Sequence, residues 1–240
     1  MVKGLEQNIV ILTGAGISKE SGLDTFRDTG GIWSKVRIED VATPEAFRRD
    51  PNSVQEFYNS RRQQLINSNV KPNTAHVALA KLEREWAGTV NIVTQNIDNL
   101  HEMGGSKNLI HMHGELLKVR CLACLNINTW SSDVNNETIC PNCKKINTLR
   151  PHVVWFGEMP LHMEKIHQLL NECSIFISIG TSGNVYPAAG FVQLATIAGA
   201  RSIELNLEPS ESATLFADAR YGAATEIVPA YVDELLQGSF

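Results

Sequence analysis

The sequence contains no apolar run of roughly 18 residues, the length that a membrane-spanning helix requires. Its first ten residues also lack the basic and then apolar segments of a secretory leader. Basic residues are not in excess, because 21 lysines and arginines stand against 26 acidic residues and give a net charge of −5. These absences argue against membrane insertion and against a surface that coats nucleic acid. We therefore expect a soluble, cytoplasmic protein.

The sequence also has no low-complexity tract and no internal repeat. Its 240 residues are 43% hydrophobic and 20% charged, which is an ordinary globular composition. This length accommodates one large domain and a small insert.

Four short apolar runs predict buried parallel strands at 8–12, 90–93, 175–179 and 202–207. Longer patterns at 74–86, 161–171, 187–199 and 210–218 predict helices between and after them. This alternation indicates an α/β fold with a doubly wound parallel sheet. Ligands bind beyond the carboxyl ends of such strands. We therefore expect the polar or glycine-bearing segments 13–18, 94–98, 180–183 and 206–208 to share one crevice.

The segment Gly14-Ala15-Gly16-Ile17-Ser18 follows the first predicted strand. Its glycines allow the backbone to approach a pyrophosphate, which favours a dinucleotide ligand. The segment lacks the third glycine of the usual dinucleotide motif, so a plain tight turn is equally compatible with it.

Four cysteines form two close pairs, Cys121 with Cys124 and Cys140 with Cys143. This spacing is typical of a tetrahedral zinc site, and disulfides are disfavoured in an intracellular protein. Four thiolates leave no open coordination position, so the zinc is expected to be structural. The fifth, Cys173, precedes an apolar run and is interpreted as a buried hydrophobic residue.

Two histidines, His111 and His113, lie on one face of the chain if the backbone between them is extended. Histidine is suited to accept a proton near neutral pH, so one of them is a candidate general base. A hydrogen-bonded structural histidine fits the pattern as well.

The spacing of apolar residues predicts a helix over 53–67, which places Tyr58 and Arg61 on one face. A guanidinium and a phenol together provide the donors that bind a carboxylate. Taken alone, the same spacing also fits an aromatic core residue beside a solvated charge.

Taken together, these motifs resemble the sirtuins, the NAD-dependent protein lysine deacylases, in order along nearly the whole chain. The matching segments are 14–18, 20–22, 26–27, 95–98, 113–114, the four cysteines, 153–158, 180–182 and 206–208. Tyr58, Arg61 and the segments 42–44 and 151–156 resemble the class III bacterial, CobB-type branch. The resemblance implies a Rossmann-like domain at 1–115 and 150–240, with a zinc insert at 116–149 inside a smaller domain.

The resemblance implies that NAD binds in the crevice and that His113 is the general base. It places Asn96 and Asp98 beside the reacting ribose as further catalytic residues. The implied NAD contacts are Gly14, Ala15, Gly16, Ser18, Phe26, Arg27, Trp33, Gln95, Asn96, Ile97, Asp98, Gly180, Thr181, Ser182, Asn206, Leu207, Glu208 and Ala224.

In the implied reaction, the amide oxygen of an acyl-lysine attacks the ribose carbon as nicotinamide leaves, and the acyl group ends on ADP-ribose. Val154, Trp155 and Phe156 are the implied walls of the lysine tunnel. Tyr58 and Arg61 are the implied receptor for acidic acyl chains, and Ala42 leaves room for them. We therefore expect acetyl, succinyl and malonyl groups as substrates.

Two other functions compete with deacylation. A zinc ribbon that binds nucleic acid would use the insert, but its basic residues are few and Trp130 is its sole stacking aromatic. Transfer of ADP-ribose to proteins would use the same crevice. We expect a monomer that binds acylated lysines and NAD and has no membrane or specific nucleic-acid partner.

Overall fold

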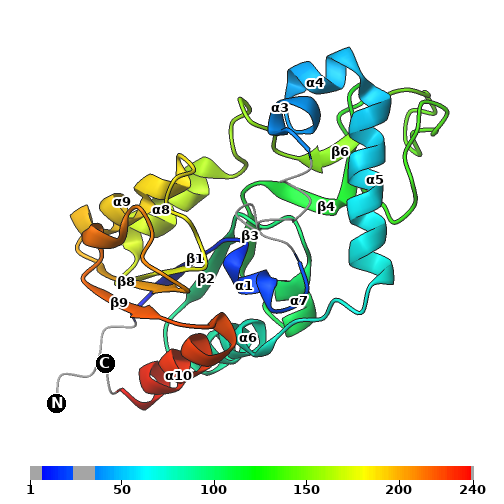
Figure 1. Cartoon of the computed structure of the whole chain (residues 1–240). Helices are drawn as coiled ribbons and strands as arrows, with labels where there is room; N and C mark the ends of the chain where they lie inside the picture. Colours follow the sequence, from blue (N-terminus) through cyan, green and yellow to red (C-terminus); the bar gives the residue numbers. More distant parts are fainter. Residues whose placement is uncertain (1–6, 24–35, 239–240) are drawn as a thin grey trace.

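The computed structural model describes residues 7–23 and 36–238. Its centre is a six-stranded parallel sheet in the order β3-β2-β1-β7-β8-β9 (Figure 1). The non-sequential order confirms the predicted doubly wound, Rossmann-like topology. The strands are β1 (Ile9–Thr13), β2 (Val90–Thr94), β3 (Leu109–His111), β7 (Ile175–Ile179), β8 (Arg201–Asn206) and β9 (Asp218–Tyr221).

Helices cover both faces of this sheet, which is why its central strands are apolar throughout. Ile9 and Ile11 face one helical layer, whereas Val10 and Leu12 face the other. The first layer contains α6 (Thr74–Glu85) and α10 (Ala224–Gln237), and the second contains α8 (Met163–Glu172) and α9 (Phe191–Ile197) (Figure 1). Three short helical segments, α1 (Gly16–Lys19), α7 (Leu100–Gly104) and η1 (Ala188–Gly190), lie in the connections.

The four predicted strands and the helices at 74–86 and 161–171 are confirmed, and 187–199 folds as η1 followed by α9. The helix predicted at 210–218 is wrong. That segment forms a 3₁₀ turn, η2 (Ala213–Leu215), and then enters edge strand β9. The Ser210 hydroxyl accepts a hydrogen bond from the Ser212 amide, and Ser202 binds the Ala217 amide, so tertiary contacts override the helical pattern.

A second, three-stranded antiparallel sheet contains β5 (Ile127–Thr129), β4 (Gly114–Cys121) and β6 (Leu149–Val153). A hydrophobic cluster that includes Val54, Leu116 and Trp155 joins it to the helices beside it. Those helices are α3 (Ile38–Val41), α4 (Pro44–Arg49) and α5 (Pro51–Asn67). The proposed domain boundaries at 116 and 149 stay a prediction, and β4 and β6 run across them.

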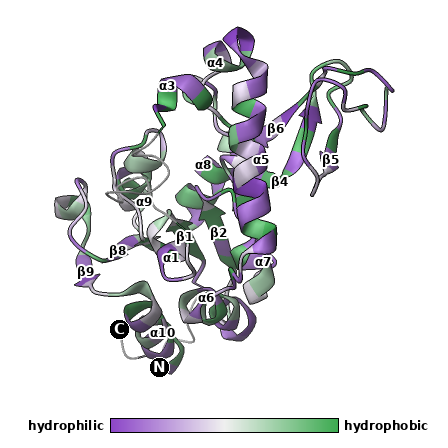
Figure 2. Ribbon diagram, turned by 45° about the vertical axis from the view of Figure 1, so that its right-hand side comes forward, coloured by the Kyte–Doolittle hydropathy of each residue, from purple (hydrophilic) through white to green (hydrophobic). Residues whose placement is uncertain are grey.

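Helix α5 begins where the sequence provides a cap. The Asp50 carboxylate accepts a hydrogen bond from the Ser53 amide at 3.1 Å, and Pro51 occupies the first turn. Farther along, the Asn59 amide exchanges two hydrogen bonds of 2.9 Å with the backbone of Val134 in the cysteine-bearing segment. This segment, residues 122–147, projects away from the large sheet (Figure 2). The two Asn59 bonds hold it against α5. Across residues 7–23 and 36–238, none of the helices has the length and apolarity to cross a bilayer.

The loops after β1 and β7 touch at three glycines. The Gly16 amide donates to the Gly180 carbonyl at 2.8 Å. A Cβ on Gly14 would lie 2.7 Å from the Gly180 oxygen, and a Cβ on Gly180 would lie 2.5 Å from the Ile17 nitrogen. Gly180 also has a φ of 61°, which disfavours any side chain. Glycine is therefore required here by both space and backbone conformation.

We predict that Gly180→Ala destabilises the protein more than Gly199→Ala does. Gly199 also has a positive φ, 95°, but a Cβ there meets nothing within 4 Å. Both variants pay the backbone cost of about 1 kcal/mol, and only Gly180→Ala adds overpacking of about 1–3 kcal/mol. Denaturant unfolding of both variants measures this difference, and equal losses would contradict it.

Candidate active site and zinc centre

One cavity of about 870 Å³ lies at the carboxyl ends of β1, β2, β7 and β8. It gathers every described residue that the sequence predicted to bind cofactor or substrate. These are Gly14, Ala15, Gly16, Ser18, Gln95, Asn96, Ile97, Asp98, His113, Gly180, Thr181, Ser182, Asn206, Leu207, Glu208, Ala224, Ala42, Tyr58, Arg61, Val154, Trp155 and Phe156. The predicted contacts Phe26, Arg27 and Trp33 lie outside the described residues.

At one end of the cavity, side-chain amides link the strand ends to one another. Gln95, after β2, donates to the Thr181 hydroxyl at 3.1 Å, and Asn206, at the end of β8, donates to the Thr181 carbonyl at 2.9 Å. Thr181 follows Gly180 and β7, so the ends of β2, β7 and β8 are tied together at this edge. The side chains at this edge are polar, and these hydrogen bonds fix their positions.

The loop after β1 is held by a second set of hydrogen bonds. The Asn96 amide donates to the Gly14 carbonyl at 3.0 Å and to the Ser18 hydroxyl at 3.2 Å. Ser18 in turn donates to the Asp98 carboxylate at 3.1 Å, and the Leu100 amide donates to the same group at 3.0 Å. Burial raises the pKa of Asp98, although these two donors oppose the shift. Asn96 and Asp98 are thus oriented toward the glycine loop.

His113 is the histidine that reaches the cavity. Its Nδ1 lies 3.0 Å from the Gln95 carbonyl oxygen, which can only accept a hydrogen bond, so Nδ1 carries the proton and Nε2 keeps a lone pair. Burial lowers the pKa of His113, which favours this neutral form. The geometry is that of a preformed base.

His111 has different partners. It ends β3, and its ring nitrogens lie 2.8 Å from Glu102 and 3.1 Å from the Asn96 carbonyl. It does not line the described cavity. The structure therefore separates two histidines that the sequence alone did not distinguish.

The sequence did not predict a buried set of hydrogen bonds at the ends of β1 and β2. Thr13 donates to the Thr94 hydroxyl at 2.8 Å, so the Nε2 proton of His101, 2.9 Å away, is donated to Thr13. Burial lowers the pKa of His101 well below its usual value. The signal was a threonine at the end of each of two adjacent strands, β1 and β2.

The other end of the cavity is built from α5 and the segment after β6. Tyr58 and Arg61, three residues apart on α5, both line it, as the helical spacing predicts. Trp155 and Phe156 line the cavity too, and the Phe156 amide donates to the Ala42 carbonyl at 3.0 Å. This end is predominantly apolar and contains a cationic side chain.

The four predicted zinc ligands lie together, with their sulfur atoms within 4.8 Å of one another. Cys121 and Cys143 are 3.7 Å apart, and Cys124 and Cys140 are 3.8 Å apart. Zn–S bonds of about 2.3 Å in a tetrahedron give sulfur separations of about 3.8 Å. The distances fit one structural zinc ion and not disulfides, and all five cysteines are unbridged. Cys173 is buried, as predicted.

The model of a protein family described as the Sir2 family matches residues 14–187. The chain belongs to this family. An NAD-dependent protein deacylase of Pasteurella multocida (strain Pm70) is 58% identical over 228 residues, which are 95% of this chain and 97% of the relative. This similarity agrees with the CobB-type, bacterial branch that the motifs indicate.

Solved structures support the same assignment for this sirtuin. A Sir2 homologue in complex with NAD superposes with a TM-score of 0.87 at 36% identity, covering 97% of this chain and 91% of that one. A Sir2 structure containing a deacetylated p53 peptide and 3′-O-acetyl ADP ribose superposes with a TM-score of 0.80 at 30% identity, covering 94% and 92%. The resemblance found in the sequence is confirmed.

We predict that each chain carries one zinc ion, and that Cys121→Ser loses it while Cys173→Ala keeps it. Loss of zinc releases the segment that holds Val134 against Asn59 of α5, so proteolysis within 122–147 becomes faster and the thermal midpoint falls. Metal analysis and limited proteolysis measure both effects. Full zinc content in Cys121→Ser would contradict the assignment.

Proposed function

We propose that this sirtuin is an NAD-dependent protein lysine deacylase that removes acetyl, succinyl and malonyl groups and releases nicotinamide and O-acyl-ADP-ribose. The observation that carries the proposal is the shared cavity, in which a polar strand-end region and an apolar region with a cation meet at His113. The volume of about 870 Å³ lies at the upper end of the usual range for ligand pockets. The name of the Pasteurella relative supports the same activity.

The strand-end region fits NAD through the chemistry of its donors. The Gln95 and Asn206 amides each keep a second hydrogen, and Thr181 keeps its hydroxyl hydrogen, so all three can donate to ribose and phosphate oxygens. The glycine loops admit a close backbone approach. When bound, NAD supplies a ribose carbon that loses nicotinamide readily, because the nicotinamide nitrogen carries a positive charge. In this proposal Asp98 accepts from the carboxamide and Asn96 orients the reacting ribose.

His113 acts in the proposal as general base toward a ribose hydroxyl. Its free Nε2 accepts the proton, and the Gln95 carbonyl holds the protonated Nδ1, so the ring is already in the required tautomer. The walls formed by Val154, Trp155 and Phe156 exclude water and align the acyl oxygen, which is a poor nucleophile. Alignment and proton removal are thus the contributions of the chain itself.

Tyr58 and Arg61 act as the receptor for an acidic acyl chain. A guanidinium and a phenol at one apolar wall supply donors that match the oxygens of a carboxylate, and a methyl group offers no acceptor to them. Ala42, 4% exposed, limits side-chain bulk there. The cytoplasmic location and monomeric state expected from the sequence stay predictions.

The first test of the base is the pH profile. Only the neutral imidazole accepts a proton, so kcat/KM falls as the pH drops through the pKa of His113. Because burial lowers that pKa, the acidic limb is expected below pH 6.5. His113→Ala should lose about 100-fold or more in kcat, whereas His167→Ala, on the exposed face of α8, should behave as wild type. An acidic limb above pH 7 would contradict the assignment.

The test of acyl specificity is Arg61→Met, with succinyl- and acetyl-lysine peptides of the same sequence. Loss of a charged hydrogen bond of about 1.5–3 kcal/mol lowers the ratio of succinyl to acetyl kcat/KM by about 10- to 100-fold. Arg48→Met on α4 makes the same charge change on a 72% exposed side chain and should leave the ratio unchanged. Equal losses for both peptides in Arg61→Met would exclude the receptor role.

A further inference from the structure

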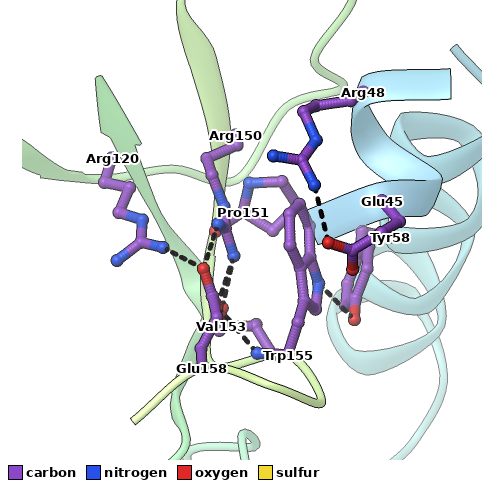
Figure 3. Close-up of polar contacts among 9 residues, drawn as sticks. All are labelled: Glu45, Arg48, Tyr58, Arg120, Arg150, Pro151, Val153, Trp155 and Glu158. Carbon is purple, nitrogen blue, oxygen red and sulfur yellow. Dashed lines mark hydrogen bonds and ion pairs between the residues drawn. The ribbon is translucent and has the colours of Figure 1, made fainter. Parts of the chain in front are cut away.

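An ion pair between buried Arg150 and partly exposed Glu158 lies against the Trp155 indole (Figure 3). Arg150, in β6, is 4% exposed, and its two terminal nitrogens donate to the two carboxylate oxygens of Glu158 at 2.7 and 3.0 Å. The guanidinium carbon lies 3.3 Å from the centroid of a Trp155 ring. The bidentate pair therefore holds the guanidinium flat against the indole.

Glu158 also fixes the backbone of Trp155, because its carboxylate accepts the Trp155 amide proton at 2.9 Å. Burial pushes the pKa of Glu158 upward, but the hydrogen bonds from Arg150 and Trp155 outweigh it and hold the pKa below its usual value. The carboxylate thus stays ionised at neutral pH. Ring and backbone of Trp155 are both positioned by the same pair.

The far edge of the same indole contacts Tyr58. The Trp155 Nε1–H donates to the Tyr58 hydroxyl oxygen at 2.9 Å, as Figure 3 shows. A hydroxyl that accepts this bond keeps its own hydrogen for another acceptor. Burial raises the pKa of Tyr58 to about 12, so that hydrogen is present at neutral pH. Tyr58 and Trp155 both line the cavity.

Charge at this end of the cavity adds a second constraint. Glu158 lines the cavity too, where a bare carboxylate would repel an acidic acyl chain. Arg120 reinforces its neutralisation, with a 3.0 Å contact to the same oxygen that binds Arg150. Glu158 therefore serves as an internal anchor for cations and not as a competitor of the substrate.

We propose that the Arg150–Glu158 pair positions the Trp155 indole so that the Tyr58 hydroxyl is turned into a donor for the acid group of an acyl-lysine. This inference rests on the acidic-acyl specificity proposed above and names the residues that enforce it. Tyr58 would contact the substrate, whereas Arg150, Glu158 and Trp155 are positioning residues.

The main test is a double-mutant cycle with Tyr58→Phe, Trp155→Phe and the double variant, measuring KM and kcat for matched succinyl- and acetyl-lysine peptides. Trp155→Phe keeps an aromatic ring and removes the N–H. We expect it to raise the ratio of succinyl to acetyl KM about three- to tenfold, the effect of one hydrogen bond. The double variant should shift the ratio no further than Tyr58→Phe alone, because the indole acts through that hydroxyl.

The matched control is Trp86→Phe, which removes an indole hydrogen bond to the Gln7 carbonyl, far from the cavity. It should leave the KM ratio unchanged. Additive effects of Tyr58→Phe and Trp155→Phe on the ratio, or equal changes for both peptides in Trp155→Phe, would overturn the inference.

Glu158→Gln tests the ion pair, because a positioning role and a purely electrostatic role of Glu158 predict opposite changes in the succinyl KM. If the pair positions Trp155, the succinyl KM rises relative to the acetyl KM. If Glu158 acts through its charge alone, removing a carboxylate from the cavity lowers the succinyl KM, and that result would overturn the inference. Should this variant not fold, Arg150→Lys takes its place, because it keeps the charge and loses the bidentate contact, and an unchanged ratio of succinyl to acetyl KM there would overturn the inference.

The outcomes also separate this inference from the proposed function. Selective loss in Arg61→Met without selective loss in Trp155→Phe removes the positioning role and leaves the acidic-acyl specificity intact. Wild-type enzyme that deacetylates but does not turn over succinyl-lysine removes the specificity itself, and the positioning role falls with it.

Discussion

The contact between the loops after β1 and β7 is the constraint on which the strand-end region depends. Gly14 and Gly16 meet Gly180 at distances that a Cβ would violate, and the Gly16 amide bonds directly to the Gly180 carbonyl. This contact brings Ser18 over the end of β2, where it bonds Asn96 and Asp98. Because glycine leaves no side chain at these three positions, the loops after β1, β2 and β7 pack into one rigid, polar surface.

The acyl end of the cavity is held by different forces. Its walls come from α5 and from the segment after β6, and they meet through aromatic contacts such as Tyr58 with Trp155, whose ring centroids are 6.3 Å apart. The ion pair between buried Arg150 and partly exposed Glu158 holds one face of the indole. Removing Glu158 leaves the buried Arg150 charge without its carboxylate partner, so these side chains are coupled to stability as well as to the proposed specificity.

The sequence predicts those features that depend on local pattern. Central strands such as β7, buried on both faces, read as continuous apolar runs. Edge strand β9, Asp218–Tyr221, is half-exposed and polar, so it carried no such signal. The grouping of strand-end residues followed from parallel topology. The proposed role of Arg150 could not be predicted from local pattern. In that role Arg150 acts on Tyr58 through Trp155, which is 97 residues from Tyr58 along the chain.

His113 lies at the junction of the two ends. Its backbone connects β3 of the large sheet to β4 of the small one, the Gln95 carbonyl fixes its ring, and its own carbonyl accepts the Val154 amide at 2.8 Å. The proposed base is thus tied both to a strand-end loop and to the proposed acyl wall. Under the proposed function, side chains at the acyl end are then free to vary with the acyl group, because His113 takes its orientation from backbone groups that such substitutions leave in place.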